Sequence, residues 1–304
     1  MFRFLCKFNF KQMTKFQADF YHANGYLVLP NILNHQEIDK LLQRTNDLVE
    51  KADLVNNQMF FDTKNAPRGM SFLDTASKIG YLLELGMIDE KGQIKVKDKK
   101  LALNKIGHAM HDLDPVFEKF SYNNIFKAVL KGVGYIDPIL AQTMVIFKNQ
   151  KFGTAVDMHT DNTYIISEPK LSCIGLWIAL EDATKNNGCM YAFPKSHLTP
   201  TTYFNVLDDT RRNTKMIGTN PEYQKHFDPS KAECLEVSKG SVILLHGDLV
   251  HFSGHNHSSQ SRHAYTLHFI EGHNNNWSKQ AWLQRIPELP FQKYYKRVSE
   301  IDTF

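Results

Sequence analysis

The sequence predicts a mainly β fold with supporting helices, a cupin-like double-stranded β-helix or jelly roll. Helical apolar patterns fill much of residues 15–138, whereas residues 139–275 contain short segments rich in β-branched and apolar residues. Two histidine-containing motifs also lie far apart in this second region, with room between them for several strands of a jelly roll. We therefore expect helices first and a jelly roll after them.

Two helices are predicted in the first half of the chain. Asn34, with Glu37 three residues later, is typical of a capping box. One apolar helical stripe follows, made of Ile38, Leu41, Leu42, Leu48 and Val49. A second helix should begin with Asp114 as its cap and Pro115 in its first turn, and end near residues 132–134. The charged segment 89–100 is interpreted as a solvated loop, with phosphate binding by its lysines as the alternative.

Four strands are predicted in the second half. They are short, separated by turn signals such as Lys-Asn-Asn-Gly, and cover residues 142–147, 171–180, 241–245 and 264–270. The sequence contains no evident internal repeat or low-complexity segment. We expect a single domain over residues 15–304, with helical support at 15–138 and the jelly-roll core at about 139–275. Residues 1–14 are expected to be a disordered extension, with a translation start at Met13 as the alternative.

Composition excludes several classes of protein. A chain of 304 residues with 42% hydrophobic residues is long enough to bury a substantial core. The net charge of +4 is mild and the basic residues are scattered among acids, so we expect no nucleic-acid partner. An acidic small molecule fits this charge better. No run of about 18 apolar residues is present, so no membrane span is predicted.

The cysteines and the N-terminus bear on the compartment. The four cysteines form no C-x-x-C pair and predict reduced thiols inside a cell, most of them as core residues; they are Cys6, Cys173, Cys189 and Cys234. Residues 1–17 are basic and rich in phenylalanine, which weakly resembles a mitochondrial transit peptide but lacks its serines and most of its arginines. A cytoplasmic location is the prediction, with mitochondria as the alternative.

An H-x-D motif occurs three times, and spacing selects one copy. His159-Thr160-Asp161 precedes His251 by 90 residues, counted from Asp161, which leaves room for the intervening strands of a jelly roll. The copies that begin at His226 and His246 lie too close to His251 and are expected to be bystanders. Two histidines and one carboxylate on one face of Fe(II) leave positions for a co-substrate and dioxygen. His159, Asp161 and His251 are therefore the predicted catalytic metal ligands.

Arg262 suggests which co-substrate would bind. It follows His251 by eleven residues, beyond a turn, so the next strand can return it to the metal. Its planar, permanently charged guanidinium suits the distal carboxylate of 2-oxoglutarate better than lysine does. The alternative is an ordinary surface or salt-bridging arginine.

The motifs together resemble the phytanoyl-CoA 2-hydroxylase family of Fe(II)/2-oxoglutarate dioxygenases. The resemblance covers nearly the whole chain after about residue 14. It is carried by the triad motifs with Arg262 and by residues 25–30, 104–109, 176–183, 187–189 and 193–197. It implies that 2-oxoglutarate is decarboxylated to succinate while an unidentified small-molecule or acyl-type substrate is hydroxylated. The implied requirements are Fe(II), 2-oxoglutarate as co-substrate, dioxygen, and ascorbate as a supporting reductant.

The resemblance also implies further residues of the co-substrate pocket. Positions matching Lys105, Met144 and Trp177 line it in similar proteins, although simple core packing is the alternative for Met144 and Trp177. Ser258 is expected to add a hydroxyl to the carboxylate site, with Ser259 and Ser261 as rivals. Five more histidines crowd this region and are not among the predicted ligands, and any of them on the wrong parity of a strand would point away from the metal; they are His255, His257, His263, His268 and His273.

Departures from the family touch no predicted ligand. Lys195 stands where glycine is usual, and Thr160 replaces a common glutamine between the first two ligands. Asp161 is present, which argues against a halogenase, because a halogenase needs that coordination position for halide.

Two other functions remain open at this stage. One is a sensor that binds metal and 2-oxoglutarate without hydroxylating a substrate. The other is a zinc hydrolase, since the same ligands can hold Zn(II). The sequence predicts neither the substrate nor the oligomeric state.

Overall fold

The computed structural model describes residues 12–56, 59–60, 70–221 and 223–296. Its α-helices are α1 (Lys15–Asn24), α2 (His35–Lys51), α3 (Met70–Asp74), α4 (Met110–Leu113), α5 (Pro115–Ser121) and α6 (Asn124–Gly132). Short 3-10 turns are η1 (Thr75–Ser77), η2 (Lys99–Ala102), η3 (Asp161–Thr163), η4 (Lys185–Asn187), η5 (Ser196–Leu198), η6 (Tyr223–His226), η7 (Pro229–Lys231) and η8 (Tyr294–Lys296). No helix within the described ranges is both long and apolar enough to cross a membrane.

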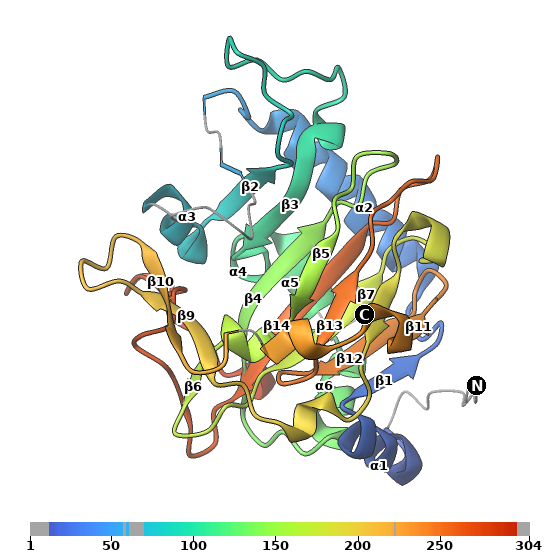
Figure 1. The fold of residues 1–304 in the computed structure, drawn as a ribbon, viewed down its shortest axis with the longest axis vertical. Coiled ribbons are helices and arrows are strands. Elements are labelled where there is room, and N and C mark those ends of the chain that lie inside the picture. The colour runs from blue at the N-terminus through green and yellow to red at the C-terminus, as the bar shows by residue number, and fades with distance from the viewer. Residues whose placement is uncertain (1–11, 57–58, 61–69, 222, 297–304) are drawn as a thin grey trace.

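Two antiparallel sheets form the body of the fold (Figure 1). The large sheet has the order β1-β12-β7-β14-β4-β3-β2. Its strands are β1 (Tyr26–Leu29), β2 (Ile79–Leu83), β3 (Leu103–His108), β4 (Pro138–Ile146), β7 (Ile174–Ala179), β12 (Val242–His246) and β14 (Ala264–Glu271). The small sheet has the order β11-β8-β13-β5, with β5 (Val156–His159), β8 (Met190–Ala192), β11 (Glu233–Leu235) and β13 (His251–Ser253). This pair of sheets is the predicted jelly roll.

Two small strand pairs lie beside this body. β9 (Tyr203–Leu207) pairs with β10 (Thr214–Gly218), and β6 (Ser167–Glu168) pairs with β15 (Asn276–Trp277).

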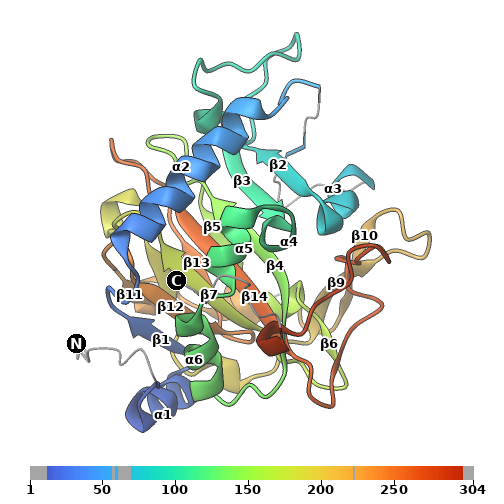
Figure 2. The same ribbon diagram turned by 180° about the vertical axis from the view of Figure 1, so that it is seen from behind.

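Helices cover the outer face of the large sheet, as Figure 2 shows for α2, α5 and α6. Strand β7 explains why both faces are apolar. Leu176 and Ile178 pack in the core beneath the helices, whereas Trp177 and Ala179 pack in the core between the sheets. Because successive side chains of a strand point to opposite faces, a strand buried on both sides is a continuous apolar run.

The helix predictions are confirmed at their starts and corrected in one place. Asn34 caps α2 by accepting from the Gln36 amide, and Asp114 caps α5 by accepting from the amides of residues 116 and 117. The predicted second helix is two helices. Helix α5 ends at Ser121, and a new helix, α6, begins at Asn124 because the Asn123 side chain caps it by accepting from the Phe126 amide.

The predicted division between helical support and jelly roll needs correction. β1, β2 and β3 belong to the large sheet although they lie before residue 139. Strands of four to six residues carry too few positions for periodicity to separate them from helix or loop. Residues 12–14, part of the extension predicted to be disordered, belong to the described structure. Met13 is buried against Gly132 and Thr14 caps α1, while residues 1–11 lie outside the described residues.

Candidate metal and co-substrate site

The three predicted metal ligands meet between the sheets. His159 is the last residue of β5, His251 is the first residue of β13, and the two lie opposite each other in the strand pairing. Asp161 follows β5 at the start of η3, whose turn brings its carboxylate back to the histidines. Its Oδ1 lies 3.7 Å from Nε2 of His159 and 3.8 Å from Nε2 of His251. These ligand atoms all lie within 4.8 Å of one another, close enough to hold one metal ion.

Hydrogen bonds fix which histidine nitrogens face the centre. Nδ1 of His159 donates to the Asp157 carbonyl at 2.8 Å, and Nδ1 of His251 donates to the Leu249 carbonyl at 3.0 Å. A carbonyl can only accept, so each ring carries its proton on Nδ1 and keeps the Nε2 lone pair for a metal. This is the support that metal-bound histidines commonly have.

Burial and neighbouring charges set the protonation states. Burial, helped by His251, lowers the pKa of His159 to about 4, so this ring is neutral at physiological pH. Burial alone would raise the pKa of Asp161, but the neighbouring His268, His251 and His159 outweigh it and hold that pKa below its ordinary value. Two imidazoles and one carboxylate are the donor set that Fe(II) takes in non-haem oxygenases.

A cavity of about 290 Å³ adjoins the triad. Its wall includes the inner face of the large sheet, where Met144, Thr266 and Trp177 lie side by side on β4, β14 and β7. Lys105 on β3 and Arg262 just before β14 also line it. The structure thus brings Lys105, Met144, Trp177 and Arg262 into one cavity with His159, Asp161 and His251.

Arg262 is a buried cation with unused hydrogen-bonding capacity. The side chain is 1% exposed, and its Nε donates to the Gly188 carbonyl at 3.0 Å. Its guanidinium carbon lies 5.2 Å from the ring centre of Trp177. Nη1 is buried without a partner among the described residues, and burial lowers the pKa of Arg262 to about 10. The guanidinium therefore stays charged at neutral pH, and its Nη1 is left to donate to an anionic ligand.

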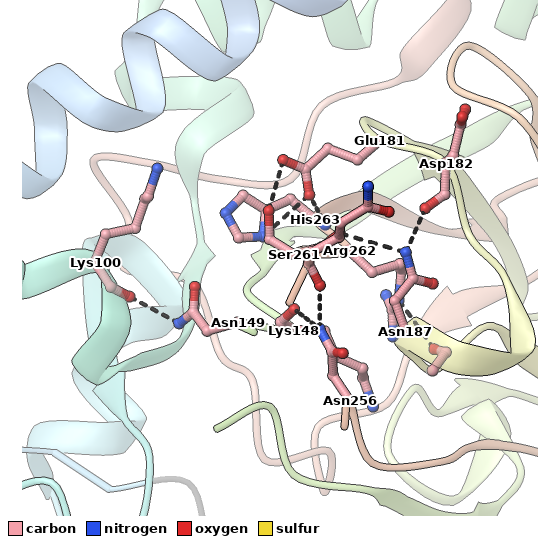
Figure 3. Close-up of polar contacts among 12 residues, drawn as sticks. Lys100, Lys148, Asn149, Glu181, Asp182, Asn187, Asn256, Ser261, Arg262 and His263 are labelled. Atoms are coloured by element: carbon pink, nitrogen blue, oxygen red, sulfur yellow. Dashed lines mark hydrogen bonds and ion pairs between the residues drawn. The ribbon is translucent and has the colours of Figure 1, made fainter. Parts of the chain in front are cut away.

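The backbone on both sides of Arg262 is held by hydrogen bonds to the Glu181 side chain and the Lys148 carbonyl (Figure 3). Glu181 accepts from the Ser261 hydroxyl at 2.9 Å and from the His263 amide at 2.8 Å. The Lys148 carbonyl accepts from the Arg262 amide at 2.9 Å and from the Asn256 side chain at 3.0 Å. A rigid backbone on both sides of Arg262 keeps its guanidinium in place before any ligand arrives.

Lys148 is a second buried cation that the sequence reasoning did not single out. Its Nζ donates to the carbonyls of Thr154 and Gly254 and to the Ser253 hydroxyl, at 2.7–2.9 Å. Burial and Arg262 hold the pKa of Lys148 well below its ordinary value. Because all three donor positions are used inside the protein, we interpret Lys148 as a support for the turn at Gly254.

Ser258 lies apart from the cavity wall. Its hydroxyl is used within its own turn, with Asn256 Oδ1 at 2.8 Å and the Gln260 carbonyl at 2.9 Å. The rival Ser261 donates to Glu181. The other two H-x-D motifs also lie elsewhere: His226 is exposed on η6, and His246 packs against His197 with ring centres 5.0 Å apart.

His268 was set aside in the sequence reasoning, yet the structure brings it to the site. Its Nε2 lies 3.4 Å from Oδ2 of Asp161, the oxygen that does not face the other two histidines. Alternate residues of a strand point to the same face, so Thr266 and His268 lie on the same face as Arg262. This alternation could have predicted that both side chains face the site. Gly175 lies opposite His268, and a Cβ there would come within 2.9 Å of Asp161 Oδ2. No sequence pattern signals that contact.

Solved structures share this fold at low sequence identity. The non-haem α-ketoglutarate-dependent carbocyclase SnoK from nogalamycin biosynthesis aligns with a TM-score of 0.61 and 16% identity, over 88% of this chain and 87% of that one. EctD from S. alaskensis, solved with 2-oxoglutarate and 5-hydroxyectoine, aligns with a TM-score of 0.56 and 16% identity, over 85% and 76% of the two chains. A jelly roll with two histidines, one aspartate and a buried arginine on one cavity defines the class of non-haem iron oxygenases that use a 2-oxo acid.

Sequence relatives name the family within that class. The phytanoyl-CoA dioxygenase (PhyH) family model matches residues 21–264. Phytanoyl-CoA dioxygenase domain-containing protein 1 homolog of Caenorhabditis elegans is 39% identical, over 91% of this chain and 97% of that protein. Phytanoyl-CoA dioxygenase domain-containing protein 1 of Mus musculus is 35% identical over 93% and 97%, and phytanoyl-CoA dioxygenase of Arabidopsis thaliana is 38% identical over 91% and 96%.

This chain belongs to the phytanoyl-CoA dioxygenase family. The predicted enzyme class, a 2-oxoglutarate-dependent non-haem iron dioxygenase, is confirmed by that membership. Several of these relatives carry the name of one subgroup, phytanoyl-CoA dioxygenase domain-containing protein 1.

Proposed function

We propose that this chain binds Fe(II) through His159, Asp161 and His251, decarboxylates 2-oxoglutarate to succinate and carbon dioxide, and hydroxylates a second, organic substrate with dioxygen. The observation that carries the proposal is the charged, buried Arg262, whose Nη1 has no hydrogen-bond partner among the described residues and which lines the same cavity as the three ligands. A dicarboxylate with a 2-oxo group can engage both ends of such a site. When bound, Fe(II) would supply the activation of dioxygen that amino-acid side chains cannot perform.

The side chains of the triad prepare the metal position without further rearrangement. Backbone carbonyls hold a proton on Nδ1 of both histidines, so Nε2 is the nitrogen left to bind the metal. His268 engages Oδ2 of Asp161 and leaves Oδ1 toward the metal position. Removal of His268 would let the carboxylate rotate.

The inner face of the large sheet would orient the co-substrate. Arg262 would bind the distal carboxylate in a two-pronged contact, while the Trp177 ring beneath the guanidinium limits its movement. Thr266 and Trp177 each have a buried polar atom without a partner among the described residues, and both lie on the cavity wall. Lys105 would add positive charge, and Met144 an apolar wall between the charged groups. Ser258 is left out of this set because its hydroxyl is used in a turn.

The remaining walls bear on the second substrate. Phe72, Tyr164 and Trp282 line the cavity, with Tyr164 6.2 Å from the ring centre of His159 and Phe72 4.7 Å from that of Trp282. Such walls exclude water and favour an apolar reacting group. We therefore propose an organic substrate whose hydroxylated carbon lies in a hydrocarbon or ring segment.

Binding measurements under anaerobic conditions separate the two halves of the proposal. We expect His251→Ala to lose Fe(II) binding, measured by calorimetry, because one of the three ligands is removed. Arg262→Ala should keep Fe(II) binding, which also shows that it folds, but lose most of its affinity for 2-oxoglutarate. Ser258→Ala is the matched control and should bind both. An Arg262→Ala variant that binds 2-oxoglutarate like wild type would contradict the proposal.

A further inference from the structure

Two cysteines distant in sequence come together beside the cavity wall. Sγ of Cys189 lies 3.4 Å from Sγ of Cys234, and both thiols are free. Cys189 precedes β8, and Cys234 is the middle residue of β11, the edge strand that pairs with β8. The sulfurs are in van der Waals contact, and a disulfide bond of about 2.05 Å would require them to approach by about 1.4 Å. The sequence reasoning treated both as isolated core residues.

The peptide bond before Cys189 is part of the Arg262 support. Its carbonyl, that of Gly188, accepts from Nε of Arg262 at 3.0 Å, and its N–H, that of Cys189, donates to the Thr184 carbonyl at 2.9 Å. Gly188 is tightly enclosed, because a Cβ there would lie 2.6 Å from the Lys148 side chain and 2.8 Å from the Gly254 carbonyl. Its φ of +83° is one that glycine adopts readily. Movement of Cys189 toward Cys234 must therefore rotate this peptide rather than carry Gly188 along.

A second connection runs from the thiols to the metal ligands. The Tyr191 side chain lies beside both thiols, and its ring stacks on Phe252 with centres 5.0 Å apart. Phe252 follows His251 directly and lines the cavity. The thiol pair thus touches elements that hold both the co-substrate arginine and one metal ligand.

We propose that Cys189 and Cys234 form an oxidative modification site: a hydroperoxide converts the pair to a disulfide, which moves the Gly188 carbonyl away from Arg262 and weakens 2-oxoglutarate binding. The effect on 2-oxoglutarate rests on the proposed function, whereas the formation of the disulfide does not.

The two thiols have different roles in this oxidation. Cys189 is fully buried, and burial together with Cys234 raises its pKa to about 12. Cys234 is partly exposed and meets the oxidant first. Its sulfur attacks one oxygen of the hydroperoxide and the O–O bond breaks, which gives a sulfenic acid on Cys234. The proton lost by the thiol goes to the leaving oxygen, which departs as an alcohol, or as water if the oxidant is hydrogen peroxide. The Cys189 sulfur then attacks the Cys234 sulfur, loses its proton, and displaces water. The two thiols lose two electrons in total, and the peroxide gains them.

The chemistry of the site can be tested by mass spectrometry. Metal-free full-length protein is treated with hydrogen peroxide, the excess is removed, and free thiols are alkylated before peptide mapping. We expect a peptide linked through Cys189 and Cys234 that dithiothreitol releases, and no such link in Cys234→Ser. Cys173→Ser, which removes a buried cysteine outside the pair, should form the link like wild type. Absence of the link in wild type would overturn the proposal.

The consequence for the co-substrate is measured on the same samples. After addition of Mn(II), which replaces Fe(II) without redox chemistry, calorimetry with 2-oxoglutarate should give a dissociation constant about tenfold higher for oxidised than for reduced wild type. Dithiothreitol should restore the affinity, and peroxide should leave Cys234→Ser unchanged. A linked protein with unchanged affinity would contradict the coupling, because edge strand β11 would then have moved instead. If reduced wild type bound no 2-oxoglutarate, the proposed function would fail, and the peptide map would still decide whether the site exists.

Discussion

A single methyl group at position 175 tests how closely the Asp161 carboxylate is held. A Cβ at this position would lie 2.9 Å from Asp161 Oδ2 and 3.6 Å from the His268 ring. Ordinary contacts of a Cβ begin at 3.4 Å, so Oδ2 would have to retreat by about 0.5 Å. Metal–ligand distances tolerate only about 0.2 Å, and loss of support around a ligand typically costs about 10–100-fold in metal affinity. We expect Gly175→Ala to weaken metal binding by about that factor.

The assay is anaerobic calorimetry with Fe(II), repeated with Mn(II) to exclude oxidation. Gly254→Ala is the matched control, because it adds the same methyl group in a loop beside the cavity where nothing lies within 4 Å of the new Cβ. The control should bind metal like wild type. Near-ultraviolet circular dichroism should show native packing in both variants. Wild-type metal affinity in a folded Gly175→Ala protein would refute the reasoning, since Asp161 would then have room to accommodate the methyl group.

Three further predictions concern buried ionisable side chains. Arg262→Lys should raise the dissociation constant for 2-oxoglutarate, measured by calorimetry, at least about tenfold. Lysine cannot both donate to the Gly188 carbonyl and make a two-pronged contact with a carboxylate. Unchanged affinity would exclude the proposed contact between Arg262 and the distal carboxylate. His263 has a pKa lowered to about 4 by burial, so the unfolded chain binds its proton first and the free energy of unfolding should fall by about 1.4 kcal/mol per unit between pH 6.5 and 4. In urea titrations, the free energy of unfolding of His263→Leu should fall less steeply with decreasing pH than that of wild type. The same pH slope in both proteins would refute this prediction. Asp114→Ala should lower the free energy of unfolding by about 1–2 kcal/mol in the same titration, because it removes the α5 cap and the partner of Arg44. The 2-oxoglutarate affinity of the folded protein should stay unchanged.

Some parts of the fold and site were predictable because their signals are local. Asp114 before Pro115 is a helix start in any context, and the long apolar run of β7 fits a strand covered on both sides. The triad was predictable because spacing along the chain distinguished one H-x-D motif from two others. Arg262 was predictable from its distance after His251.

Other parts depend on contacts between distant segments and leave no local pattern. β1 is only four residues long and becomes a strand because β12 pairs with it. Ser258 was expected at the carboxylate site, but the turn it occupies consumes its hydroxyl. The proximity of Cys189 and Cys234 arises from the pairing of β8 with β11, which no spacing in the sequence specifies.

The central claim is that the His159, Asp161 and His251 centre decarboxylates 2-oxoglutarate with the help of Arg262. The most direct measurement is succinate formed from 2-oxoglutarate after oxygen is admitted to protein reconstituted anaerobically with Fe(II). We expect wild type to form succinate, and His159→Ala and Arg262→Ala to lose nearly all of it at the same 2-oxoglutarate concentration. Succinate formation that persists in a metal-free His159→Ala protein, or that is equal in wild type and Arg262→Ala at limiting 2-oxoglutarate, would contradict the claim.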